Sequence, residues 1–267
     1  MDRREKFEDY TRRLAESVGR HEDVEGLVLL GSTAAVDRVD EWSDHDFYLV
    51  VREGRQEHFR NDLSWLPRVD EVLFAVRETE HGLKVVYRDG AVLEFAVASG
   101  PEISTFGGSP WVVVLDRADV TARMEASPPP PAVQEPDDLR EFRLFLSLVL
   151  IGVGRARRGE ELAGGELVRT YATERLLKVL RHRLQPQPET PESTPDPFNV
   201  FRRFEAAWPV VGAALGRAMA LPVDECGARL LGIAESFLMP VWPDYPADET
   251  NAIRHRLGYA CPDDAQA

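Results

Sequence analysis

The feature that most constrains this chain is residues 27–51, where two short apolar runs flank a polar connection. The first run, residues 27–30, is too short and too apolar for an exposed helix and predicts a buried strand. It ends at Gly31-Ser32, and glycine permits both a sharp turn and a close approach to a ligand. The second run, residues 47–51, predicts another strand. The order is therefore strand, tight turn, short helix over residues 33–39, and strand.

The Gly31-Ser32 turn predicts an anion site. Ser32 lies where the short helix begins, and the first amides of a helix have no partner inside it. Together with the Ser32 hydroxyl, these amides can hold an anion, phosphate above all.

Asp44 and Asp46 stand at the start of the second strand, on either side of His45. Residues two apart on a strand point to the same face, so the two carboxylates face one point and His45 faces away. Adjacent carboxylates repel each other unless a cation lies between them. A phosphate-holding turn followed by this pair predicts a site for a nucleoside triphosphate with magnesium.

Gly31-Ser32, a spacer of eleven residues and Asp-x-Asp on a strand together resemble the polymerase-beta-like nucleotidyltransferase superfamily. In length and layout the chain is most similar to the aminoglycoside adenylyltransferases of the streptomycin type. The resemblance implies an α+β chain. Its N-terminal nucleotidyltransferase domain would hold a mixed β-sheet flanked by helices, and its C-terminal domain would be an α-helical bundle.

That superfamily uses a third carboxylate on a later strand, and Glu94 matches it by position. Residues 82–87 and 91–97 predict a hairpin around Arg88-Asp89-Gly90, because Asp-Gly is a strong turn signal. Glu94 would share a strand face with Val92 and Ala96, the face with fewer large apolar groups. Glu71 is the rival third carboxylate, but it begins its strand, predicted over residues 71–76, instead of lying inside it.

The resemblance also implies a mechanism. One Mg²⁺ would be held by Asp44, Asp46 and the triphosphate, and a second would bridge Asp44, Asp46, Glu94 and the acceptor hydroxyl. In-line attack on the α-phosphate of ATP would release pyrophosphate. Glu94 would serve as metal ligand or as general base, and Ser32 would anchor the β- and γ-phosphates.

The proline-rich stretch that begins at Ser127 predicts a stiff connection between two domains. The domains would then be residues 1–126 and 137–267, joined by a linker over residues 127–136. In the first domain, residues 2–22 and 56–66 predict helices and residues 111–116 predict a strand. In the second, helices are predicted over residues 138–158, 166–184, 200–207, 210–220 and 223–239. Residues 185–197 predict a proline-rich loop, and residues 244–267 an acidic tail.

Relatives use a lysine or arginine of the helical domain to contact the triphosphate. Arg175 and Lys178 are the candidates by position, although a solvated charged helix face is the better explanation for either residue taken singly. Histidines show no pair at metal-ligand spacing, so zinc is not expected.

The composition limits which classes of partner the chain can bind. A net charge of −14 argues against general nucleic-acid binding. It favours a cationic small-molecule acceptor, although solubility alone explains the charge at least as well. No apolar run is long enough to cross a membrane. The charged N-terminus and two cysteines without metal spacing suit a reducing cytoplasm.

Three classes of function stay open at this stage. The first is an adenylyltransferase acting on a small cationic molecule such as an aminoglycoside, and hence antibiotic resistance. The second is a nucleotidyltransferase that modifies a protein or RNA, as in toxin–antitoxin pairs. The third is a catalytically silent nucleotide-binding module. The sequence leaves the acceptor and the choice between monomer and homodimer undecided.

Overall fold

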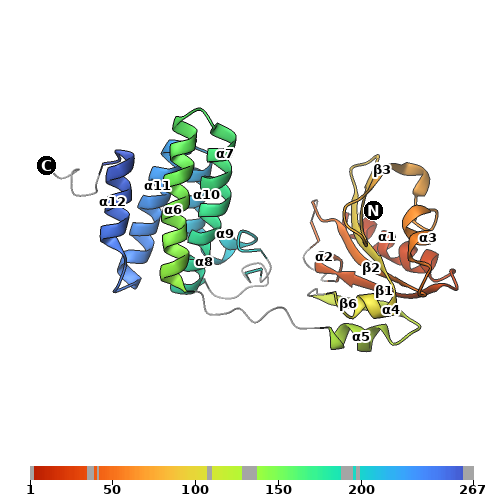
Figure 1. The fold of residues 1–267 in the computed structure, drawn as a ribbon. Coiled ribbons are helices and arrows are strands. Elements are labelled where there is room, and N and C mark those ends of the chain that lie inside the picture. Colours follow the sequence, from red (N-terminus) through yellow and green to blue (C-terminus); the bar gives the residue numbers. More distant parts are fainter. Residues whose placement is uncertain are drawn as a thin grey trace. The chain divides into compact units, whose positions relative to one another are not determined.

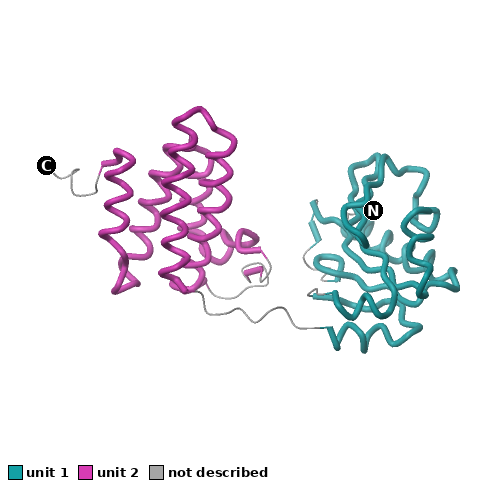
Figure 2. Tube along the Cα trace, in the orientation of Figure 1, with its two compact units in different colours: residues 1–132 teal, residues 133–267 magenta. Residues whose placement is uncertain are grey.

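The computed structural model of this 267-residue chain describes residues 3–34, 39–40, 42–106, 110–127, 137–187, 195–196 and 199–260. The chain divides into two compact units, residues 1–132 and 133–267 (Figure 2). The predicted linker, residues 127–136, spans this division, and its residues 128–136 lie outside the described part.

The first unit is built on a six-stranded sheet with the order β3-β4-β5-β2-β1-β6 (Figure 1). β2 and β5 run parallel, and the other neighbouring pairs are antiparallel. The sheet is therefore mixed, as predicted. The strands are β1 Val24–Leu30, β2 His45–Val51, β3 Val72–Arg77, β4 Gly82–Tyr87, β5 Val92–Ala98 and β6 Trp111–Asp116.

One face of this sheet forms the main core of the first unit. Helix α1, Arg3–Val18, lies within the helix predicted over residues 2–22. It buries Tyr10, Leu14 and Val18 against alternate residues of β1, β2, β4 and β5. Helix α3, Gln56–Asn61, adds Phe59 to the same core. Period-two alternation along β4 and β5 matches this burial, with one residue buried and the next half-buried.

The opposite face is covered only in part. Helices α4, Gly100–Ile103, and α5, Val120–Ala126, pack Ile103, Val120 and Met124 against Val28 and Val50. Towards β3 this face is open, because Phe74 and Val76 are about half exposed. Neither α4 nor α5 was predicted.

The first strand begins three residues before the predicted 27–30. Gly26 lies inside this strand. A side chain at this position would clash, because its Cβ atom would come within 2.6 Å of the Val120 side chain of α5. A glycine inside a strand usually marks such a close approach.

The second unit is helical, as predicted. Its long helix α6, Asp138–Arg157, packs on α7, α8 and α11 around one hydrophobic core. The remaining helices of this unit are α7 Glu161–Gly165, α8 Thr173–Arg183, α9 Phe204–Ala207, α10 Pro209–Met219, α11 Val223–Leu238 and α12 Ala247–Leu257.

Three predictions for this unit were wrong in detail. Residues 166–184 are not one α-helix, because a π-helical segment, Glu166–Ala172, precedes α8. The helix predicted over residues 200–207 is only α9, which follows Arg203 in the left-handed region at a φ of 60°. The acidic tail predicted from residue 244 contains α12. Most of the predicted proline-rich loop, residues 188–194 and 197, lies outside the described residues.

Within the described residues, no helix is both long enough and apolar enough to cross a membrane. Cys226 is buried as a free thiol, and Cys261 lies outside the described part of the chain.

Candidate functional site

Three carboxylates meet at one end of the parallel strand pair. Asp46 on β2 is directly opposite Glu94 on β5, and Asp44 comes just before β2. The ligand oxygens of Asp44, Asp46 and Glu94 all lie within 4.8 Å of one another, and the three residues are half-buried. The structure therefore brings together the three acidic residues that the sequence singled out.

Such a cluster has the chemistry of a site for a hard divalent cation. Three half-buried carboxylates repel one another, and a cation between them removes this cost. Oxygens bound to one Mg²⁺ lie about 2.0–2.1 Å from it, and therefore no more than roughly 4.2 Å apart. The observed spacing, with all atoms within 4.8 Å of one another, needs only a small closure around one ion.

Gly31 lies against this cluster. Its φ is +54°, in the left-handed region, and a Cβ atom there would come within 3.0 Å of Oδ2 of Asp46. The backbone amide of Gly31 donates to the Pro110 carbonyl at 3.1 Å, which ties the turn to the start of β6. Glycine is thus required both for the turn and for its approach to the carboxylate.

Ser32 is half-buried on the short helix α2, Gly31–Ala34, directly after that glycine. A short helix is present, but it begins at Gly31, two residues earlier than predicted, and residue 39 is not helical; residues 35–38 lie outside the described part. The phosphate-binding role of Gly31 and Ser32 stays a prediction.

Thr33 is a site residue that the sequence analysis missed. Its hydroxyl accepts a hydrogen bond from the Asp46 amide at 2.9 Å and lies 3.5 Å from the Asp44 carbonyl as donor. The side chain is 3% exposed, so water does not replace these bonds. Thr33 therefore joins α2 to the start of β2 and fixes the backbone that carries both aspartates.

Lys84 is the second missed residue. It faces Glu94 across the β4–β5 pair, and its Nζ lies 2.5 Å from Oε1 of Glu94 and 2.9 Å from Oε1 of Glu78. These hydrogen bonds raise the pKa of Lys84, and the bond to Glu94 has the larger effect. The side chain therefore stays an ammonium at neutral pH. The chain thus supplies a cation of its own at the edge of the carboxylate cluster.

His45 points away from the cluster, as predicted. Its ring stacks on Phe7 with centroids 3.7 Å apart, and Nε2 is 3.2 Å from the Phe7 carbonyl oxygen. Burial lowers its pKa to about 4, so the imidazole is neutral at pH 7. This histidine packs helix α1 on the sheet.

Tyr48 lies two residues beyond Asp46 on β2, so it shares the carboxylate face. Burial, and to a lesser degree the charge of Asp46, raise the pKa of its phenol. The ring contacts Phe106 edge-on at 5.3 Å.

The rival third carboxylate is engaged elsewhere. Glu71 ends the 3₁₀ turn Val69–Glu71, which precedes β3. Its Oε2 lies 2.5 Å from Nη2 of Arg68, and this pairing lowers the pKa of Glu71. It is not a member of the cluster that the described residues form.

Arg175 and Lys178 belong to α8 in the second unit. Arg175 lies 2.9 Å from the buried carboxylate of Glu141, and Lys178 lies 2.7 Å from Glu174 one turn earlier. Both side chains therefore have ion-pair partners within their own unit, as residues of a charged helix face would have without any triphosphate. Their contact with a triphosphate stays a prediction.

Comparisons with known proteins find only distant likenesses. No family model and no curated protein matches the chain. Among solved structures, it is similar to an aminoglycoside 6-adenyltransferase from Bacillus subtilis, with 11% identity, a TM-score of 0.31, and coverage of 98% of this chain and 94% of that one. It is also similar to a CdnC:HORMA-deltaN complex from E. coli MS115-1, with 13% identity, a TM-score of 0.28, and coverage of 88% and 90%.

The first of these proteins is of the kind that the sequence resembles. Because both TM-scores are below 0.5, the likenesses carry no argument about the chemistry of this chain. The interpretation of the site depends on its own residues.

Proposed function

We propose that this protein transfers a nucleotidyl group, AMP from ATP, to a hydroxyl of a small cationic acceptor and releases pyrophosphate. The observation that carries the proposal is the register of β2 and β5. It sets Asp46 opposite Glu94, with Asp44 two residues earlier and the Gly31 turn against Asp46.

Asp44, Asp46 and Glu94 would hold Mg²⁺. When bound, the ion would neutralise charge on the phosphates and on the attacking and leaving oxygens. The residues fit this role because all three ligands are carboxylates, the donors that Mg²⁺ prefers. All three residues are partly exposed, as access of a nucleotide requires.

The backbone around α2 would position the phosphates. The absence of a side chain at Gly31 lets the turn lie beside Oδ2 of Asp46, so a phosphate on the bound metal would lie close to this turn. The hydroxyl of Ser32 would donate to a phosphate oxygen, and Thr33 would keep Asp44 and Asp46 in place through its bonds to their backbone.

Glu94 would orient the acceptor hydroxyl and take up its proton during attack, or bind the metal directly. Its Oε1 is held by Lys84. An ammonium 2.5 Å away limits how far the carboxylate can turn. Lys84 would therefore position Glu94 for either role.

The acceptor is proposed to be cationic because the chain has a net charge of −14. A surface of this sign attracts cations and raises their encounter rate. An aminoglycoside carries several ammonium groups beside its hydroxyls and fits this description.

The test is pyrophosphate release with Mg-ATP across a panel of aminoglycosides and lincosamides, with adducts identified by mass spectrometry. Acceptor-dependent release that is lost in Asp46→Asn, and kept in Glu71→Gln, would support the proposal and name the substrate. Bound Mg-ATP without any turnover would move the acceptor to a protein or to an untested small molecule. Absence of nucleotide binding would overturn the proposal.

A further inference from the structure

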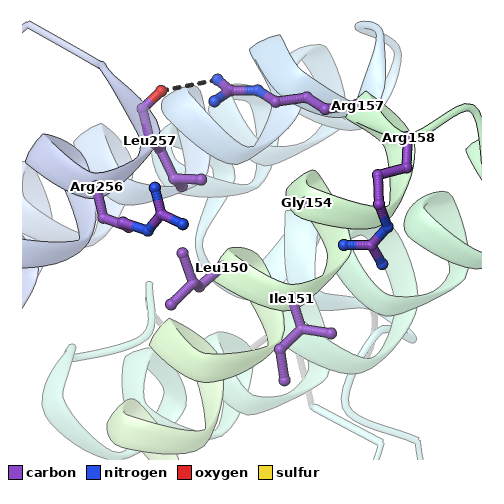
Figure 3. Close-up of a pocket in the computed structure, with 7 residues that line it drawn as sticks. All are labelled: Leu150, Ile151, Gly154, Arg157, Arg158, Arg256 and Leu257. Atoms are coloured by element: carbon purple, nitrogen blue, oxygen red, sulfur yellow. Dashed lines mark hydrogen bonds between the residues drawn. The ribbon is translucent and has the colours of Figure 1, made fainter.

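The second unit contains a hollow that the proposed reaction does not use. It lies between the C-terminal part of α6 and the end of α12, and its volume is about 440 Å³ (Figure 3). This is within the range of small-molecule sites, roughly 300–1,000 Å³.

The rim of the hollow is cationic. Arg157, Arg158 and Arg256 line it, although the whole chain has a net charge of −14. In Figure 3 the guanidinium groups of Arg158 and Arg256 lie on opposite sides of the space. Guanidinium groups bind phosphate and carboxylate through paired N–H donors. A rim of this kind selects an anion.

Arg157 has a different role from the other two. Its Nε and Nη2 donate to the carboxylate of Asp224, and Nη2 also donates to the Leu257 carbonyl at 2.8 Å. This arginine therefore ties α6 to α11 and to the end of α12. Arg158 lies on the exposed surface with Glu160 3.3 Å away, an ion pair that a ligand can displace at little cost.

The floor of the hollow is apolar. Leu150 and Ile151 form it, and Ile151 is 51% exposed. Gly154 keeps the floor open: a Cβ atom at this position would meet only Nη1 of Arg158, at 3.9 Å. A side chain here would project into free space.

Cations at helix ends have a simpler explanation, because they interact favourably with the negative end of the helix dipole. Arg157 and Arg256 both lie in last turns. The dipole explains why arginines are stabilising there. It does not explain an exposed isoleucine and an open glycine directly beneath them, which suit the apolar part of a ligand.

We propose that this hollow binds a small amphipathic anion. Its acid group, a phosphate or a carboxylate, would lie between Arg158 and Arg256, and its apolar body would rest on Leu150 and Ile151. The site would be independent of the carboxylate cluster and would take part in no transfer step.

The test is isothermal titration of the full-length protein in EDTA at low salt, with 1-naphthyl phosphate and 1-naphthoate as probes. Inorganic phosphate and 1-naphthol separate the contributions of the acid group and the apolar body. The variants are Arg256→Gln, Arg158→Gln and Gly154→Leu. Arg217→Gln, an exposed arginine on α10, is the charge-matched control. Thermal unfolding of each variant checks that it folds.

The proposal predicts one saturable site for at least one naphthyl acid, with affinity at least tenfold higher than for inorganic phosphate or 1-naphthol. Comparison of the two acids identifies the preferred acid group. Arg256→Gln and Gly154→Leu each weaken binding at least fivefold, while Arg217→Gln does not. Asp46→Asn binds the probe as the parent protein does, which separates this site from the proposed active site. No saturable binding, or binding unchanged in Arg256→Gln and Gly154→Leu, would overturn the proposal.

Discussion

Lys84 on β4 lies opposite Glu94 on β5, with its ammonium nitrogen 2.5 Å from a carboxylate oxygen. The carboxylate that completes the acidic cluster is thus also part of an internal ion pair. A metal ion that bound Glu94 through this oxygen would compete with the lysine, so we expect Lys84 to lower the affinity of the cluster for metal.

Replacement of Lys84 by methionine removes the competing charge and keeps most of the length of the side chain. We expect Mn²⁺ to bind the variant about two- to fivefold more tightly without nucleotide, the range expected for loss of an exposed ion pair. Turnover should fall because Glu94 loses its positioning contact. Electron paramagnetic resonance of free Mn²⁺ measures the affinity. Lys178→Met, which breaks the pair with Glu174, should leave it unchanged, and equal effects of the two variants would contradict the competition.

Gly31→Ala should weaken cation binding through a steric contact. The alanine Cβ would lie 3.0 Å from Oδ2 of Asp46. The left-handed backbone also costs a non-glycine residue about 1–2 kcal/mol. We expect lower thermal stability and about tenfold weaker Mn²⁺ binding, as for a change beside metal ligands.

Gly54→Ala is the matched control for that change. Gly54 also has a positive φ, +83°, but a Cβ atom there would meet nothing within 4 Å. It should lose stability and keep its affinity for Mn²⁺. If both variants lost affinity equally, contact with Asp46 would not be the cause.

Thr33→Val keeps the shape of the side chain and removes its hydroxyl. The amide of Asp46 then loses its buried acceptor, at a cost of about 1–3 kcal/mol in the free energy of unfolding. We expect a lower midpoint in urea and weaker Mn²⁺ binding, with Thr33→Ser close to the parent protein in both. A valine variant with unchanged Mn²⁺ affinity would show that Thr33 supports the fold but not the site.

The buried imidazole of His45 should make the free energy of unfolding of the metal-free protein depend on pH. Burial lowers its pKa from 6.5 to about 4, so between these values the unfolded chain binds more protons than the folded one. His45 therefore does not lower the free energy of unfolding above pH 6.5. This free energy falls as the pH drops from 6.5 through 4, by about 3 kcal/mol at most. In EDTA, urea unfolding of His45→Phe should show a shallower loss than the parent protein. His58→Phe, at an exposed position, should follow the parent, and a parallel loss in all three would contradict the assignment.

Only part of the carboxylate cluster could be predicted from the residues themselves. The choice of Glu94 depended on the resemblance to the nucleotidyltransferases, because nothing in the sequence shows that β5 pairs with β2. Strand periodicity did predict that Asp44 and Asp46 share a face. The same reasoning could have found Lys84: a hairpin centred on Asp89 pairs residue 84 with residue 94, as the observed register does. Thr33 gave no such signal, because its bonds to the Asp46 amide and the Asp44 carbonyl cross from one element to another.

Helix α12 was missed because two of its buried positions are polar. Thr250 and Arg254 are buried, where an apolar stripe would show leucine or isoleucine. Arg254 is accommodated there by an ion pair with Glu235 of α11, 2.9 Å away. Only the tertiary structure reveals this partner, so apolar periodicity alone could not predict the helix. The short helix α4 did carry a signal, a capping box of Ser99 and Glu102.

The central claim is that Asp44, Asp46 and Glu94 form one divalent-cation site. The most direct measurement is a titration of Mn²⁺ followed by electron paramagnetic resonance, for the parent protein, Asp46→Asn, Glu94→Gln and the control Glu71→Gln. We predict loss of the tightest binding in the first two variants and no change in the third. Without metal, Asp46→Asn should also unfold at a higher temperature, because the repulsion among the carboxylates is reduced. Equal Mn²⁺ affinity in all four proteins would contradict the claim.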